Sequence, residues 1–225
     1  MRLDIGNSID LLHFTGVYEG DQLTLGADFF TWTSLRQDAA FHFPVDAVDY
    51  LFGINTAYRH RLNASSSLSA RLRLSHISAH LVDGSYDKSN REWRDGEMPH
   101  VYSREFFDII LAYDYSDLLR LYGGGQYIYH IDPADLDKIA LQAGIEVAWV
   151  DAMESDLHIY TAYDIRLLDS GTMRSAHGLQ AGVKFGTWRG SGLNIFVAYY
   201  HGPSQHGEYF DRLWSYWGPG LNVDF

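Results

Sequence analysis

The chain has 225 residues, a formal net charge of -12 and no cysteine. The negative charge argues against a nucleic-acid partner, which needs a basic surface, and the lack of cysteine excludes disulfide and thiolate chemistry. Hydrophobic residues make up 46% of the chain, yet the mean hydropathy is -0.21, so they are dispersed. No stretch approaches the roughly 18 uninterrupted apolar residues of a membrane helix. A helical membrane protein is therefore excluded.

Apolar and polar residues alternate along almost the whole chain, which is the period of a half-buried β-strand. In 157–167, for example, Ile159 and Ile165 share one face, and Asp164 and Arg166 share the other. The pattern predicts an eleventh strand at the C-terminus and no helix. The other ten are predicted, in chain order, at 2–14, 22–34, 48–61, 67–81, 101–115, 118–130, 139–149, 157–167, 178–188 and 193–199.

The connections between these strands alternate between tight and long. Tight turns are predicted near 19–21, 62–65, 116–117, 152–155 and 189–192, and long loops near 35–46, 82–100, 131–137, 168–176 and 201–212. Bacterial transmembrane barrels have short turns at the inner end and long loops at the outer end. The sequence therefore predicts an all-β fold, a transmembrane antiparallel up-and-down β-barrel that forms a single domain over 1–225.

The period alone does not say which face is enclosed, but the composition of the polar face does. Arginine is plentiful there and is mixed with carboxylates, which suits an enclosed, hydrogen-bonded interior. We expect the apolar face to contact lipid and a polar network to line the lumen. This network comprises Asp49, Arg59, Arg71, Arg73, Arg104, Asp108, Arg120, Glu146, Asp164 and Arg166.

The alternation of tight and long connections also bears on the number of strands. With long loops outside, strand 2–14 runs inward and the eleventh strand ends inside. Single-chain bacterial barrels have even strand counts and keep both ends inside. We therefore expect twelve strands in the full-length protein, with one strand and a signal peptide upstream. The segment "MRLDIGNSIDLL" itself lacks the apolar core and the cleavage site of a signal peptide.

The C-terminal segment "GPGLNVDF" resembles the signal by which bacterial outer-membrane barrels are read by their insertion machinery. Gly220, Val223 and Phe225 fall where that pattern has a glycine, a hydrophobic residue and a terminal aromatic. Pro219 departs from the pattern, because proline cannot donate a hydrogen bond to a ladder. The resemblance implies a bacterial outer-membrane location, with the insertion machinery and membrane lipids as partners.

Four further segments, "RLRLSHISAHLVDG", "YSREFFDIILAYDY", "LRLYGGGQYIYHIDPADL" and "LQAGIEVAW", resemble an uncharacterised family of bacterial outer-membrane proteins, the domain of unknown function 1207. The match runs in order over most of the chain. It implies a barrel in the outer membrane of a Gram-negative bacterium. It supplies no activity, so any function must come from the residues.

The segment "SHISAH" holds the candidate catalytic residues. By alternation His76 and Ser78 face lipid at the outer end of their strand, and Glu105 on the next strand faces outward beside His76. A serine, a histidine and an orienting acid form the constellation of nucleophilic hydrolysis. The arrangement is similar to that of outer-membrane lipid A deacylases and phospholipases. It predicts that His76 takes the proton of Ser78, that Glu105 holds the imidazole, and that an outer-leaflet lipid ester is attacked.

Other interpretations stay open. Polar residues at an outer strand end are tolerated at headgroup level, and a bulge would turn His76 and Ser78 inward. A barrel of this size also allows a narrow pore or a structural or surface role. We expect no cofactor and no metal site, since no spacing matches a zinc site. The histidines in or near the long loops are His42, His80, His100, His130, His177, His201 and His206. The sequence does not determine a substrate or an oligomeric state.

Overall fold

The computed structural model describes residues 1–225 except 17–19, 83, 97, 152–155 and 170–171. The described residues form one antiparallel sheet of eleven strands and a separate two-stranded hairpin, β5 and β6. The eleven strands are β1 (Arg2–Thr15), β2 (Gln22–Leu35), β3 (Val45–Arg61), β4 (Ser66–Leu81), β7 (Ser103–Tyr115), β8 (Leu119–Asp132), β9 (Ile139–Asp151), β10 (Leu157–Asp169), β11 (Met173–Gly186), β12 (Gly192–Pro203) and β13 (Leu213–Asp224).

The remaining elements are short. The hairpin strands are β5 (Tyr86–Asp87) and β6 (Glu92–Trp93), and three single-turn 3-10 helices occur at η1 (Ala39–Phe41), η2 (Arg94–Gly96) and η3 (Gly207–Tyr209). No helix in the described part of the chain is long and apolar enough to cross a membrane.

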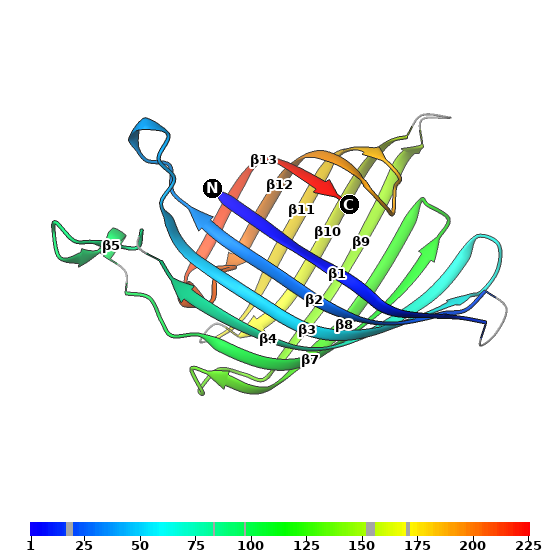
Figure 1. Cartoon of the computed structure of the whole chain (residues 1–225), viewed down its shortest axis with the longest axis horizontal. Coiled ribbons are helices and arrows are strands. Elements are labelled where there is room, and N and C mark those ends of the chain that lie inside the picture. The colour runs from blue at the N-terminus through cyan, green and yellow to red at the C-terminus, as the bar shows by residue number, and fades with distance from the viewer. Residues whose placement is uncertain (17–19, 83, 97, 152–155, 170–171) are drawn as a thin grey trace.

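Each strand of the main sheet pairs with its neighbour in the chain, once the β5–β6 hairpin is set aside. This confirms the predicted all-β, up-and-down order and the eleven strands. The sheet curls so that its first and last strands come back toward each other, as Figure 1 shows. The fold is therefore β-barrel-like, with a concave inner face and a convex outer face.

One predicted loop is wrong. The sequence predicts a long connection at 168–176, but β10 extends to Asp169 and β11 begins at Met173, where the two strands still pair. The β10–β11 register runs without a bulge to the end of both strands, so that Leu168 lies opposite Arg174 and Asp169 opposite Met173. Residues 170–171 of this prediction, and the predicted turn at 152–155, lie outside the described residues.

Alternation along the strands separates the two faces as predicted. Ile195 and Val197 on β12 point outward and are 50% and 51% exposed. Asn194, which directly precedes Ile195, points to the concave side and is buried. The same outward row of apolar side chains recurs from β2 to β13, with members such as Phe52, Ile54, Leu72, Ile109, Leu111, Leu141, Ile159, Leu179 and Leu221. The convex face is therefore apolar and uncovered.

The concave face is not polar throughout. At the end that carries the long connections it holds a buried apolar cluster of Leu51, Ile77, Tyr102, Phe106, Ile128, Ile131 and Leu136, with Phe30, Trp32, Ala79 and Phe210 packed against it. Arg104, expected in a polar network, instead places its guanidinium over the rings of Tyr102 and Phe106, 5.8 and 5.3 Å from their centroids. Inward positions at this end are filled by side-chain packing.

The two edge strands, β1 and β13, are not hydrogen-bonded to each other in the described structure. Because eleven strands alternate in direction, the first and the last run the same way. The edges approach at the loop end, where the Arg2 guanidinium and the Tyr216 hydroxyl both donate to the side chain of Gln205.

Of the predicted insertion signal, Gly220 and Val223 lie on the edge strand β13, and Phe225 directly follows it. Pairing with β12 runs through Pro219, which lies opposite Val197. Gly220 lies against the ring of Phe196, so a side chain at this position would overlap it. Val223 and Phe225 are exposed.

Candidate functional sites

A cluster of histidines surrounds Glu105 on the outer face. His76 of β4 lies directly opposite Glu105 of β7, and its Nδ1 is 2.7 Å from Oε1 of the carboxylate. His130 of β8 approaches from the other side, with its Nδ1 2.6 Å from Oε2. The predicted contact between His76 and Glu105 is therefore present, and one carboxylate holds two imidazoles.

Sequence reasoning missed the position of His130 because a β-bulge changes the face. Strict alternation from the buried Ile128 places His130 inside. The β7–β8 register shifts between Glu105 and Phe106, so Tyr129 has no opposite residue and His130 turns outward. The signal in the sequence is the three-residue spacing of Ile128 and Ile131, which breaks the two-residue period of a strand. In the structure both isoleucines are buried.

Ser78 faces outward as predicted, but its hydrogen bond goes to a different histidine. Its Oγ lies 2.9 Å from Nε2 of His80, two residues further along β4. The ring of His80 packs edge-on against Tyr50 of β3, with the ring centroids 5.5 Å apart. The structure therefore holds a serine–histidine pair beside a separate histidine–glutamate–histidine group. It does not place Ser78, His76 and Glu105 in one hydrogen-bonded chain.

These groups do not form a metal centre. Within the described ranges, no group of three or more His, Asp or Glu side chains is arranged to hold a metal ion. The contacts of His76 and His130 run to two different oxygens of Glu105, which is the geometry of hydrogen bonds to a shared carboxylate.

A second region is the segment 204–212, which follows β12 and folds into the concave side. His206 is 1% exposed and Glu208 is 4% exposed. The backbone N–H of Gly207 donates to Oδ2 of Asp49 on β3 over 2.8 Å. Asp49, predicted to line a lumen, therefore anchors this segment across the interior.

Aromatic packing holds the same segment in place. Gly207 lies so close to the ring of Tyr102 that a side chain there would overlap it. Phe210 packs against Tyr102 and His100, with ring centroids 5.7 and 5.1 Å away. The backbone N–H of His100 donates to the carbonyl of Glu208 over 2.9 Å. The long connection between β12 and β13 thus completes the apolar cluster at the loop end.

Three buried polar atoms meet where this segment docks. Asp49 Oδ1, Glu208 Oε2 and His206 Nδ1 have no hydrogen-bond partner among the described residues. His206 Nδ1 lies 3.7 Å from Asp49 Oδ1. Burial, and next the neighbouring carboxylate of Asp49, raise the pKa of Glu208 to about 7, although the backbone N–H of Leu81 opposes the shift.

The third region is the polar part of the concave face, where most of the predicted network lies. Arg73 contacts Asp28 at 3.0 Å and Asp108 at 3.9 Å, and Arg166 contacts Asp164 at 3.0 Å. Arg73, Asp108, Asp164 and Arg166 all belong to the expected network, while Asp28 was missed because β2 alternates less cleanly than the other strands.

Asp114 joins two distant parts of the sheet. It accepts from Arg189 at 2.5 Å and from Arg120 at 3.4 Å, both through Oδ1. Arg189 belongs to the turn between β11 and β12, so this ion pair crosses the interior to the end of β7. The sequence gives no local signal for such a contact, because the two residues are 75 positions apart.

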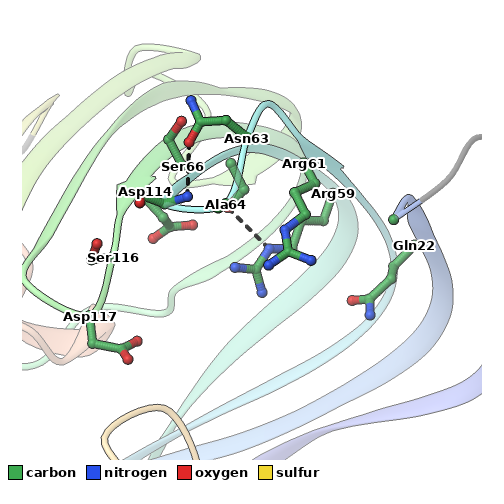
Figure 2. A pocket seen from close by; sticks show the side chains of 12 residues that line it. Gln22, Arg59, Arg61, Asn63, Ala64, Ser66, Asp114, Ser116 and Asp117 are labelled. Carbon is green, nitrogen blue, oxygen red and sulfur yellow. Dashed lines mark hydrogen bonds between the residues drawn. The ribbon is translucent and has the colours of Figure 1, made fainter.

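Two hollows open on the polar part of the concave face. One, of about 350 Å³, lies at the tight-turn end between the turns 62–65 and 116–118. Figure 2 shows Arg59 and Arg61 reaching into it from β3, with Asp114 and Asp117 on another wall. The other, of about 410 Å³, contains Arg71, Arg120 and Glu146 in its lining. All five of the residues Arg59, Arg71, Arg73, Arg120 and Glu146 thus lie on the predicted inner face.

Comparison with known proteins identifies a family but no related protein of known function or structure. A family model described as "Protein of unknown function (DUF1207)" matches residues 42–225. No curated protein and no solved structure matches the chain.

The raised pKa of Glu208 predicts that docking of segment 204–212 depends on pH. An undocked Glu208 has a pKa near 4.5 and the docked one about 7, so the docked state binds the proton more tightly. Docking is strongest below pH 4.5, weakens as the pH rises to about 7, and is constant above. We expect a change on the order of a hundredfold in the docking equilibrium.

Hydrogen exchange of segment 204–212, corrected for intrinsic rates, measures this change between pH 5 and pH 8. Glu208→Gln should remove the pH dependence, whereas Asp211→Asn, at an exposed position of the same segment, should keep it. An unchanged pH dependence in Glu208→Gln would contradict the assignment of this effect to Glu208.

Proposed function

Because the chain belongs to the family described as protein of unknown function (DUF1207), we propose its role from the fold: an integral β-barrel protein of the bacterial outer membrane, with a structural or surface role and a lumen closed at the loop end. The observation that carries this proposal is the uncovered apolar face. Exposed apolar side chains follow each other along the outward rows of β2 to β13. Apolar patches of this extent mark contact with a membrane or with another protein.

A bilayer favours this face for a simple reason. In water, every exposed leucine or isoleucine costs free energy in proportion to its apolar area. In lipid this cost is removed, while charged groups such as Arg73 and Asp108 stay paired on the concave side. Outer-membrane lipids are accordingly the proposed surroundings of the protein, and the barrel insertion machinery is the proposed partner.

The same environment sets a requirement on the edges of the sheet. The bilayer core contains no water to hydrogen-bond free N–H and C=O groups, so a spanning sheet must be closed. The edges β1 and β13 run in the same direction, and one further strand that runs antiparallel to both would close the sheet. We propose that polypeptide upstream of β1 supplies this strand, which gives an even count of twelve.

Closure by a twelfth strand predicts protected amides at both edges. In protein extracted from its native membrane, the edge-facing amides of β1 and β13 should exchange as slowly as those of β7 and β8, which are paired on both sides and serve as the internal reference. If the edges exchange on the order of a hundredfold faster than this reference, the sheet is open and the proposed strand is wrong.

The proposal that the lumen is closed rests on the side chains and the segment that fill the loop end. Segment 204–212 is held by Asp49 and Tyr102. Behind it the inward side chains of β3, β4, β7 and β8 form the apolar cluster around Leu51, Ile77 and Phe106. Both layers would have to move before ions could cross, because apolar packing excludes water from this end.

Planar-bilayer recordings test this proposal. The intact protein should be electrically silent, and replacement of residues 205–211 by a Gly-Ser linker of equal length should produce discrete conductance steps, because it removes the docked segment. The same replacement at 38–42, in the connection between β2 and β3, should leave the protein silent. Steady steps from the intact protein would instead support a narrow pore.

A lipid-ester hydrolase is the second candidate. The observation in its favour is the outward Ser78–His80 pair, with the His76–Glu105 contact beside it. In this proposal Ser78 Oγ bonds to the carbonyl carbon of an outer-leaflet ester, and His80 Nε2 takes the hydroxyl proton. His80 then returns this proton to the leaving alcohol, and water hydrolyses the acyl-serine. His80 replaces His76 as the expected base.

Ester cleavage in mixed phospholipid–detergent micelles tests the hydrolase. Ser78→Ala and His80→Ala should each lower the turnover at least about a hundredfold, since both act on the reacting proton. Ser103→Ala, on the strand directly opposite Ser78, is the matched control and should keep full activity. Absence of cleavage by the intact protein, or full activity in Ser78→Ala, would exclude the hydrolase.

A further inference from the structure

We infer that the 410 Å³ hollow on the concave face is a binding site for a small monoanionic solute of the carboxylate class, centred on Arg71. The hollow is built by adjacent strands, from β3 to β9, and its lining includes Arg71, Arg120 and Glu146. Its size is within the range of small-molecule sites. This inference does not depend on the proposed membrane role, because all of its residues lie on one continuous part of the sheet.

The first argument is that Arg71 has no ion-pair partner among the described residues. Its Nε is buried without a hydrogen-bond partner, and no carboxylate of the described residues lies within ion-pair distance of its guanidinium. The Nε of Arg73, two residues along on the same face, also has no hydrogen-bond partner, but Arg73 forms ion pairs with Asp28 at 3.0 Å and with Asp108 at 3.9 Å. A partly buried charge without an ion-pair partner is costly, and an anionic ligand would offset that cost. Of these two arginines, Arg71 is the one left for a ligand.

The second argument concerns Arg120, which lines the same hollow. Its partner Asp114 is held more closely by Arg189, since the same Oδ1 lies 2.5 Å from Arg189 and 3.4 Å from Arg120. Arg120 is therefore only weakly engaged. It also lies within electrostatic range of Arg71, which is repelled by Arg73 and Arg120 and attracted, from beyond ion-pair distance, by the carboxylates of Asp108 and Asp28. An anion between Arg71 and Arg120 would remove their repulsion, as bidentate guanidinium contacts do for carboxylates.

The walls of the hollow indicate a small ligand with a single charge. Ala57, Ser69 and Ala112 are small, which leaves the space in front of Arg71 open. Glu146 lies opposite Arg120 on β9 and adds a negative charge to the far wall. A doubly charged anion such as sulfate would be repelled by this carboxylate more strongly than a monocarboxylate.

Access is from the tight-turn end. Three of the small lining residues have a neighbour two positions away on the same strand and face that lines the first hollow: Arg59 for Ala57, Ser67 for Ser69, and Asp114 for Ala112. Arg59 and Arg61 project into that first hollow (Figure 2). Their charges would attract an anion toward Arg71 along this path.

Fluorine NMR with trifluoroacetate as the probe tests the site on the detergent-solubilised protein. The intact protein should broaden the probe signal in a saturable way, and acetate should compete better than sulfate. Arg71→Gln should weaken binding at least tenfold. Arg36→Gln, which removes an arginine paired with Asp46 away from the hollow, should bind as the intact protein does.

A second variant keeps the test independent of any folding defect in Arg71→Gln. Ala57→Leu fills the hollow without changing a charge and should also abolish saturable binding, while circular dichroism confirms the strand content of each variant. Three results would overturn the site: no saturable broadening by the intact protein, unchanged binding in both Arg71→Gln and Ala57→Leu, or tighter competition by sulfate than by acetate.

Discussion

The two-residue period of the antiparallel ladder decides which side of the sheet each side chain takes, and the rest of the molecule depends on it. Where the ladder is regular, as through β10 to β12, apolar residues such as Ile195 point outward and their neighbours point inward. A single bulge on β8 is enough to move His130 to the opposite face and to bring it to Glu105. The constraint is strict because one extra residue reverses every side chain that follows.

A curled sheet creates a second problem, which is the filling of its concave side. The chain solves it differently at the two ends. At the loop end, apolar side chains and the segment 204–212 pack into a dry cluster around Phe106. At the tight-turn end, charged groups bridge the interior, as Arg189 does when it reaches Asp114 from four strands away along the sheet. The curvature of the sheet and its internal contacts are thus mutually dependent.

The sequence predicted what local periodicity controls and missed what long-range packing controls. The strands, the outward direction of His76 and its contact with Glu105 all follow from alternation and register. The docking of Glu208 does not, because an irregular loop carries no period that tells whether it folds in or out. Alternation also assigns Leu51 and Asp49 to the same face without saying that an apolar cluster forms there. The partner of Ser78 was missed because either neighbouring histidine satisfies the same parity.

The unequal filling of the two ends bears on what the interior can do. A conduit needs both ends open, whereas here the loop end is closed by the docked segment, whose Phe210 packs against Tyr102. The hollows lie toward the opposite end, where arginines and carboxylates face a space large enough for a solute. A solute that reached Arg71 from the tight turns would have to leave by the same path while segment 204–212 stays docked. The geometry therefore favours a chamber that holds a ligand over a channel that passes one. A change from chamber to channel would require undocking of segment 204–212, and this undocking is predicted to depend on the protonation of the buried Glu208 carboxyl.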